Sequence, residues 1–481
     1  MSKADRPQDV VEAALAVAAG AGQGVEAAVV VEEESSVNLR WAMNGMTTNG
    51  LARGRSVTAV VTAPVEGGRG VGVLTRTGVG VGDVADLVAE AKALAAAGSP
   101  AEDAAALVEG GAGADWDEEA VTTGAPVLAE VAAGLGEVLA SSGAQGREAF
   151  GFALHELTTT WLGTSAGTRH RHVQPRGTIE LTGKSHGRTR STWVGRGTRD
   201  FSDVDVLALD AEVRRRLDWQ ARTVGLPPGR YDTILPPEAV ADFMIYLYWS
   251  ADARSAHEGR SVLSRPGGGT RAGESVSALP WRLWSDPTLP GLECDDVVVA
   301  RSSSPFASVF DNGLLSPAQT WLDGGRLLRL PTTRHTAAMT GLPLAPAVDN
   351  LALDLSADHP SRHAGAGGAA PALTDPEHLL AGLSRGLLLT SMWYVREVDP
   401  LSLLLTGLTR DGVYLVEDGE VAAAVPNFRF NVSPMDLLTA ADAVGASRAA
   451  LSREWGEYFT RTSMPSLRVR GFNMSSVSEA S

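Results

Sequence analysis

The segment ILPPEAVADF, residues 234–243, decides how this sequence divides into structural elements. The residues from Tyr231 to Leu235 (YDTIL) are typical of a short strand that ends in two apolar residues, and a mostly apolar stretch of helical length follows from Pro237 to Tyr248. Proline is favoured at the first position of a helix, because its missing N–H would have no partner there. We therefore predict a strand over 231–235 that leads directly into a helix over 237–248.

The Pro/Gly-rich break Leu226-Pro227-Pro228-Gly229 separates two kinds of pattern. Before it, helical spacing over 7–21, 83–97, 127–139 and 204–223 alternates with strand-like runs within 27–75 and 149–194. Asn44-Gly45 and Asn49-Gly50 are turn signals between those strands. After it, strands and turns dominate, and we expect helices at 375–383, with Asp375 as N-cap, and at 435–444. Two domains are predicted, an N-terminal α/β domain over 1–225 and a β-rich domain over 226–481, in an α+β fold.

Composition excludes several classes of protein. The net charge of −16 argues against a general nucleic-acid binder. A single cysteine, Cys294, rules out a disulfide framework and a Cys-rich zinc site within the chain. The N-terminal residues lack an apolar signal core, and no run of eighteen or more apolar residues suggests a transmembrane helix. We expect a cytoplasmic protein that binds neither nucleic acid nor membrane.

The histidines do not form the familiar zinc-peptidase pattern, in which two His on one helix face flank a Glu. The pair His155-Glu156 has no second His at helical spacing and is predicted to lie on a strand. The pair His257-Glu258 precedes Gly259 and is predicted to lie in a loop. Each pair is therefore interpreted as a surface or hydrogen-bonded His rather than as part of a metal site.

Two other groups of residues carry alternative chemistry. His170 and His172 share one face of a predicted strand and could bind a metal ion, although Arg169 and Arg171 flank them and oppose a cation. The residues around Ser165, GTSAG, match the G-x-S-x-G pattern of serine hydrolases. That pattern requires a following helix, whereas residues 168–173 read as a second strand, so a hairpin turn accounts for them better.

The segment 234–243 resembles the "hydrophobic strand, His-Glu-x-x-x-His, helix" segment of the TldD/PmbA peptidase family, also called the modulator of DNA gyrase family. Pro237 stands where that motif has its first His, Glu238 keeps its Glu, and Asp242 stands where it has its second His. The family's catalytic chains have a third ligand, a Cys, near the position of residues 452–459, and this chain has no Cys there. Other segments resemble the family in the same order along the chain: 37–45, 162–167, 311–313, 332–334, 393–396, 416–421 and 465–469.

The resemblance implies an N-terminal α/β part, a barrel-like C-terminal β part and a heterodimer. One chain of that heterodimer, TldD-like, carries the catalytic zinc. This chain would be the TldE-like subunit, with no metal of its own and with a degenerate motif at Pro237, Glu238 and Asp242. It would complete a chamber for unfolded or small peptides, which bind as extended strands. General proteolysis and maturation of a peptide-derived product are both open.

The remaining side chains of this segment have plainer interpretations. Without a metal ion, Glu238 is favourable beside the positive end of the helix dipole. Phe243, Tyr246, Tyr248 and Trp249 are expected to face the core, or otherwise a subunit interface. Three functional hypotheses follow: a non-catalytic peptidase subunit, a self-sufficient metalloenzyme that uses His170 and His172, and a serine hydrolase that uses Ser165.

Overall fold

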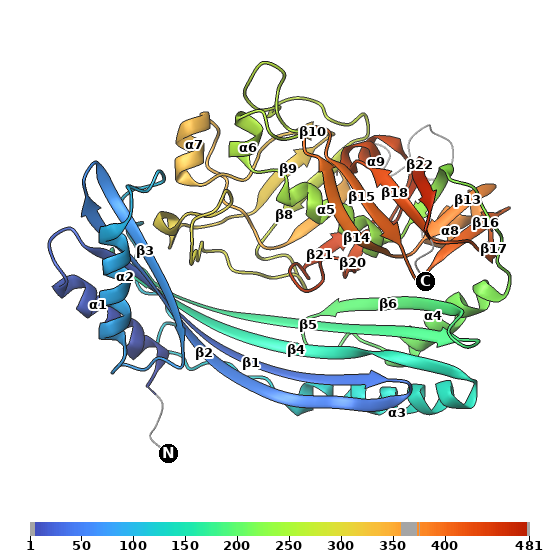
Figure 1. Cartoon of the computed structure of the whole chain (residues 1–481), viewed down its shortest axis with the longest axis horizontal. Helices are drawn as coiled ribbons and strands as arrows, with labels where there is room; N and C mark the ends of the chain where they lie inside the picture. The colour runs from blue at the N-terminus through green and yellow to red at the C-terminus, as the bar shows by residue number, and fades with distance from the viewer. Residues whose placement is uncertain (1–4, 357–372, 375, 479–481) are drawn as a thin grey trace.

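A long, curved, antiparallel sheet of six strands forms the N-terminal half of the chain (Figure 1). The computed structural model describes residues 5–356, 373–374 and 376–478. The strand order is β3-β2-β1-β4-β5-β6, with β1 (Glu26–Ala42), β2 (Gly45–Val65), β3 (Gly68–Thr77), β4 (Arg147–Thr164), β5 (Arg169–Ser185) and β6 (Arg190–Thr198). The sequence suggested several short strands here, whereas β1, β4 and β5 each run for 17 or 18 residues.

The predicted turn at Asn44-Gly45 is confirmed, and the one at Asn49-Gly50 is wrong. Ala42 pairs with Gly45 at the tip of the β1–β2 hairpin, where Met43 and Asn44 have positive φ. Asn49 and Gly50 lie inside β2, paired with Leu39 and Asn38. The continuous register between two long strands overrides the local turn preference.

The two faces of this sheet have different roles, as alternation along β1 shows. Val29 and Val31 pack with α1 (Pro7–Gly20) and α2 (Val84–Ala97) on the outer face. Ala28 and Val30 pack with residues from the C-terminal half, including Phe310, on the inner face. Farther along β1, the inner-face positions are polar. The sheet therefore presents an apolar surface to its helices and a largely polar one to the C-terminal half.

Three helical segments, η1 (Ala125–Leu128), α3 (Ala129–Ala144) and α4 (Val206–Asp218), cover the rest of the outer face. The segment η2 (Trp219–Ala221), which follows α4, packs against the C-terminal strands. Close packing of α2 on β3 requires glycine, because a Cβ at Gly72 would lie 1.9 Å from the Ala91 carbonyl oxygen. The predicted helices in this half are confirmed, with ends shifted by a few residues.

One helix within the described residues, Ala125–Ala144, is long and apolar enough to cross a membrane by length and composition. Its Leu128, Val131, Leu135 and Val138 pack with sheet residues such as Trp41. Because a sheet-covering helix of a globular protein passes the same test, this finding is weak evidence of a membrane span. The expectation that the chain does not bind membranes stays a prediction.

The C-terminal half consists of two further sheets with few helices, and the predicted α+β fold is confirmed. A ten-stranded, curled sheet contains β7 (Gly229–Leu235), β12 (Leu373–Thr374), β13 (Arg385–Leu389), β14 (Met392–Asp399), β15 (Leu404–Thr409), β16 (Val413–Glu417), β17 (Glu420–Ala424), β18 (Phe428–Val432), β19 (Ala441–Gly445) and β22 (Leu467–Val477). A six-stranded sheet contains β8 (Trp281–Ser285), β9 (Gln319–Asp323), β10 (Arg326–Leu327), β11 (Leu351–Leu355), β20 (Arg448–Ala450) and β21 (Thr462–Met464).

Helix α5 (Pro237–Trp249) follows β7 directly, as the sequence predicts, and is almost completely buried in the largest core. The other helical segments are α6 (Ala253–His257), η3 (Val309–Asp311), α7 (Arg334–Thr340), α8 (Pro376–Ala381) and α9 (Pro434–Ala440). The predicted helix over 435–444 is only partly right, because the chain enters β19 at Ala441. Asp375, the predicted N-cap, lies outside the described residues.

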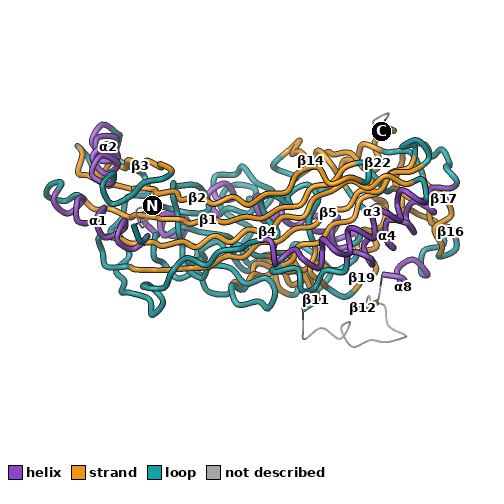
Figure 2. The backbone as a smooth tube through the Cα atoms, turned by 90° about the horizontal axis from the view of Figure 1, so that it is seen from below, coloured by secondary structure: helices purple, strands orange, loops and turns teal. Residues whose placement is uncertain are grey.

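The C-terminal half rests on the inner face of the long sheet, and α1, α3 and α4 lie on the opposite face (Figures 1 and 2). Within the described residues, every strand of the long sheet lies before residue 225. Its last strand, β6, ends at Thr198, and the next strand of the chain, β7, begins at Gly229. The domain boundary at 225/226 stays a prediction. The arrangement places the start of α5 close to β6, the edge strand of the long sheet, and this closeness builds the site described next.

Candidate functional site

The degenerate motif lies at the buried start of α5, between the two halves of the chain. Pro236 is the extended residue before the helix and Pro237 occupies its first turn, so the missing N–H of Pro237 leaves no helical hydrogen bond unmade. Glu238 and Asp242 lie one helical turn apart on α5, and both are buried. The two acidic residues have different partners, and these partners determine what the site can hold.

Glu238 joins two arginines that come from different sheets. Its Oε1 accepts from Arg196 Nη1 of β6 at 3.0 Å, and its Oε2 accepts from Arg448 Nη2 of β20 at 3.2 Å. Burial disfavours the charged carboxylate, but the charges of Arg448 and Arg196 outweigh burial, so the pKa of Glu238 lies below its usual range. Glu238 is therefore an ionised link between the long sheet and the C-terminal half.

Asp242 is held by the stretch in which the family resemblance places a Cys ligand. Its Oδ1 accepts from the Ser452 hydroxyl and from the Glu454 backbone N–H at 3.0 Å. The Trp455 indole donates to the Asp242 backbone carbonyl at 2.9 Å. The other carboxyl oxygen, Oδ2, is buried without a partner, and burial raises the pKa of Asp242 to about 7. The fold thus brings Asp242 against the stretch 452–459, in which the family resemblance places the third ligand.

These residues do not fit a zinc ion. Pro237 has no donor atom, Ser452 donates its hydroxyl proton to Asp242, and Glu238 already faces two cations. A zinc ion beside Arg196 and Arg448 would add positive charge to an existing cationic pair. Across the described residues, no group of three or more His, Cys, Asp or Glu side chains is arranged to hold a metal ion.

The other histidine candidates have protein partners of their own. On β5, His170 Nε2 lies 2.9 Å from Asp295 Oδ1, and His172 Nε2 lies 3.1 Å from Gln174 Oε1. Burial lowers the pKa of His170, but the hydrogen bond and charge of Asp295 prevail and raise it above its usual value. His155 lies on β4, where it contacts the Thr123 hydroxyl and the Arg199 carbonyl. His257 ends the short helix α6 rather than lying in a loop.

Ser165 and Cys294 lack the surroundings of nucleophiles. Ser165 lies in the hairpin turn between β4 and β5, as predicted, where its hydroxyl is 3.0 Å from the Ala27 N and 3.3 Å from the Ala27 carbonyl oxygen. No histidine contacts it among the described residues, so the base that a serine nucleophile needs is missing. Cys294 is buried, and burial raises the pKa of its thiol to about 12.

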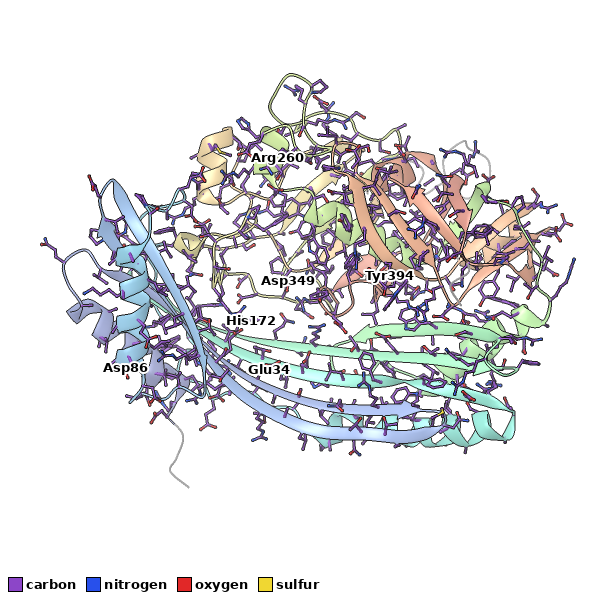
Figure 3. The ribbon with its side chains drawn as sticks, viewed as in Figure 1. Glu34, Asp86, His172, Arg260, Asp349 and Tyr394 are labelled. Carbon is purple, nitrogen blue, oxygen red and sulfur yellow. The ribbon has the colours of Figure 1, made fainter. Side chains whose placement is uncertain are left out.

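A polar cleft separates the inner face of the long sheet from the C-terminal half. A cavity of about 590 Å³ is lined by Glu32, Glu34 and Glu156 from the sheet and by Asp295 and Asp349 from the facing loops. Figure 3 shows Glu34 and His172 on the sheet side, with Asp349 on the opposite side. Arg301 forms an ion pair with Glu32, and Arg461 forms one with Asp349. Arg176 Nε lies 3.8 Å from Glu156 Oε2. Burial raises the pKa of Glu156, and the charge of Glu34 adds to this effect while that of Arg176 opposes it.

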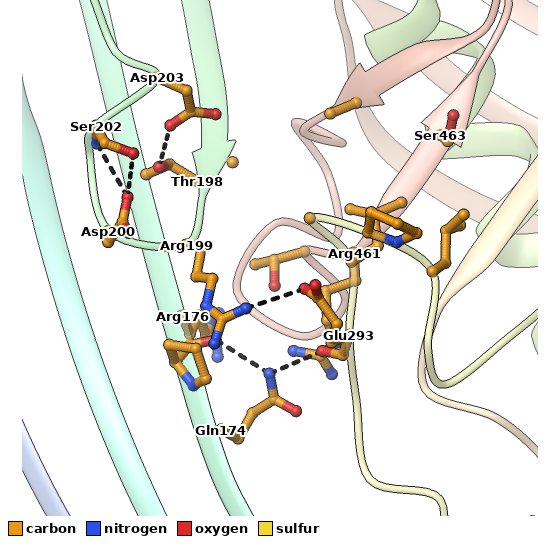
Figure 4. A pocket seen from close by; sticks show the side chains of 18 of the residues that line it. Gln174, Arg176, Thr198, Arg199, Asp200, Ser202, Asp203, Glu293, Arg461 and Ser463 are labelled. Carbon is orange, nitrogen blue, oxygen red and sulfur yellow. Dashed lines mark hydrogen bonds and ion pairs between the residues drawn. The ribbon is translucent and has the colours of Figure 1, made fainter. Parts of the chain in front are cut away.

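A second cavity, of about 410 Å³, adjoins the first and lies near the C-terminal end of β6 (Figure 4). Arg176 and Arg461 border both cavities, and Arg199 pairs with Glu293 across the second one at 3.4 Å. The Gln174 amide donates to the Glu293 carbonyl at 3.1 Å. The two cavities together make an elongated space with charges of both signs, which is suited to an extended chain rather than to a small apolar ligand.

Sequence reasoning located Glu238 and Asp242 but missed their partners. Arg196 and Arg448 lie 42 and 210 residues from Glu238, and no local pattern around them indicates a buried ion pair. One signal was available: a Glu in the first turn of a helix that is mostly apolar, and therefore buried, requires a counter-charge from elsewhere.

Comparison with known proteins identifies relatives of both the sequence and the fold. The family model of the PmbA/TldA metallopeptidase C-terminal domain matches residues 228–476, more than half of the chain. The structure of TldE from Thermococcus kodakarensis is similar with a TM-score of 0.74 at 14% identity, covering 96% of this chain and 99% of that one. That of a proposed DNA gyrase modulator from Thermotoga maritima has a TM-score of 0.73 at 17% identity, covering 97% and 99%. That of another such protein, from Bacteroides thetaiotaomicron, has a TM-score of 0.69 at 13% identity, covering 98% and 99%. No curated protein sequence matches the chain.

Proposed function

Because the chain belongs to the TldD/PmbA family of metallopeptidases, we propose that it is the metal-free, TldE-like subunit of a two-chain zinc peptidase. The observation that carries the proposal is the state of the three expected ligand positions. Pro237 cannot bind a metal, Asp242 accepts two hydrogen bonds from the 452–454 turn, and no cysteine lies in that turn. The partner chain supplies the zinc in this proposal.

The cleft supports a role in holding peptide. Its lining combines carboxylates, guanidinium groups and hydroxyls, and such a surface can bind main-chain and side-chain groups of an extended peptide. In this proposal the chain positions the substrate in the cytoplasm and has no peptidase activity alone. General proteolysis and the maturation of a peptide product are both compatible with such a cleft.

The test is peptidase activity of the purified chain, alone and after co-expression with a TldD-like chain that has an intact His-Glu-x-x-x-His motif. We expect activity only in the pair, and expect it to disappear when the motif Glu of the TldD-like chain is replaced by Gln. Ser165→Ala in this chain is the matched control and should leave the activity of the pair unchanged. Activity of the isolated chain that Ser165→Ala abolishes would favour the serine hydrolase instead, and stoichiometric metal that His170→Ala removes would favour the self-sufficient metalloenzyme.

A further inference from the structure

A third cavity lies beside the start of α5, where Pro236 and Pro237 are part of its lining. It has a volume of about 540 Å³ and is enclosed by α4, η2, the end of β7, β13 and β20. Figure 1 shows α4 below the C-terminal strands β16 and β17. One part of the wall is apolar, with Ile234, Leu388, Leu380, Trp219, Val204 and Leu209. It shares no lining residue with the two cavities of the cleft except Asp203, which borders the second of them.

The polar wall of this cavity contains guanidinium groups whose donors are only partly used. Arg196 donates to the Gly195 carbonyl and to Glu238, and Arg448 donates to Glu238. A guanidinium has five N–H donors, so both groups keep donors for a ligand. Their side chains are 36% and 40% exposed, while that of Glu238 is 6% exposed behind them.

Four arginines line this wall in two pairs, and each pair shares one carboxylate. Arg196 and Arg448 share one carboxylate, Glu238, and Arg215 and Arg216 share another, Glu212. Burial lowers the pKa of Arg196. The charge of Glu238 opposes this effect, and the charges of Arg448 and Arg216 add to it. Two further acids of the lining, Asp203 and Asp205, are exposed; they accept hydrogen bonds from Thr198 and from the first turn of α4.

One residue of the lining, Ser466, has a buried hydroxyl group without a partner. Ser466 is 1% exposed, and its Oγ forms no hydrogen bond. A buried hydroxyl left unpaired costs roughly 1–3 kcal/mol, so native proteins seldom keep one without a function or a bound group.

We propose that this cavity binds the C-terminal carboxylate of a peptide whose last residue is apolar. Two guanidinium groups provide the planar, charge-assisted hydrogen bonds that carboxylates accept, and the apolar wall accommodates the terminal side chain. The peptide nature of the ligand rests on the proposed function. The binding itself is a property of this chain alone, so it can succeed or fail independently of any activity with a partner.

The experiment is calorimetric titration of the purified full chain with N-acetyl-alanyl-leucine, with its C-terminal amide and with N-acetyl-alanyl-glycine. We expect saturable 1:1 binding of the leucine acid, and binding at least tenfold weaker for both the amide and the glycine peptide. Equal binding of acid and amide, or no saturable binding of the acid, would overturn the proposal. Binding of the glycine peptide as tightly as the leucine peptide would overturn the role of the apolar wall.

Two variants locate the binding site. Arg448→Gln should weaken acid binding at least tenfold, although it also disturbs the buried Glu238. Ala208→Trp avoids that difficulty, because Ala208 is an exposed residue of α4 that lines the cavity, and the larger side chain should block it. Its matched control is Leu207→Trp, since Leu207 is the neighbouring residue, 47% exposed, and does not line the cavity. Binding that survives Ala208→Trp, or is lost equally in Leu207→Trp, would contradict the assignment.

Discussion

Glu238 and Glu34 are two glutamates that face the space between the halves of the chain, and they are held in opposite ways. Glu238 is buried, ionised and fixed by two arginines from separate sheets. Glu34 is exposed in the cleft and has no ion pair within the described part of the chain. The difference separates two tasks: Glu238 joins the two halves of the molecule, while Glu34 keeps a carboxylate in the cleft that no arginine of the described residues neutralises.

The largest expected effect concerns Asp242, whose pKa is about 7 in the folded chain and about 3.9 when unfolded. Because the pKa is raised in the folded chain, the protonated carboxyl group stabilises the fold fully below about pH 4, and this stabilisation is lost as the pH rises through 7. Asp242→Asn removes this loss, so at pH 8 the variant should be more stable than the wild type by up to about 4 kcal/mol. Denaturant unfolding from pH 4 to 8 measures the difference. A difference that does not change with pH would contradict the buried, unpaired carboxyl group.

A smaller effect distinguishes the two glutamates directly. Glu238→Ala leaves Arg196 and Arg448 without their shared carboxylate, and it should lower the free energy of unfolding by about 3 kcal/mol. Glu34→Ala is the matched variant in the cleft and should change it by less than about 0.5 kcal/mol. Both values come from urea unfolding at pH 7. Similar losses in the two variants would show that the cleft carboxylates are also structural.

How far the sequence predicts this site depends on the distance between its parts. The β7–α5 junction was predictable, because Pro237 and the apolar spacing lie within one short segment. The pairing of Glu238 with Arg448 was not, since it depends on β20 packing beside α5. The turn predicted at Asn49-Gly50 was wrong for a related reason, because pairing with the neighbouring strand β1 imposes a strand conformation on these two residues.

The smallest effect is expected in the cleft itself. The double variant Glu34→Gln with Glu156→Gln removes two negative charges from the sheet face without changing side-chain volume. We expect the pair of chains to bind a lysine-containing peptide about fivefold more weakly, an effect that should shrink at high salt, while a neutral peptide is unaffected. Fluorescence anisotropy of labelled peptides at two salt concentrations measures this. Equal losses for both peptides would mean that these carboxylates do not act through their charge.

In the proposed heterodimer, this chain contributes no ligand to the catalytic zinc. The most direct measurement is native mass spectrometry of the co-expressed pair, followed by dissociation of the pair and determination of zinc in each separated chain. We expect one zinc per pair, found with the TldD-like chain, and none with this chain even after incubation with excess zinc. Stoichiometric zinc retained by this chain, and lost in the Asp242→Ala variant, would contradict it.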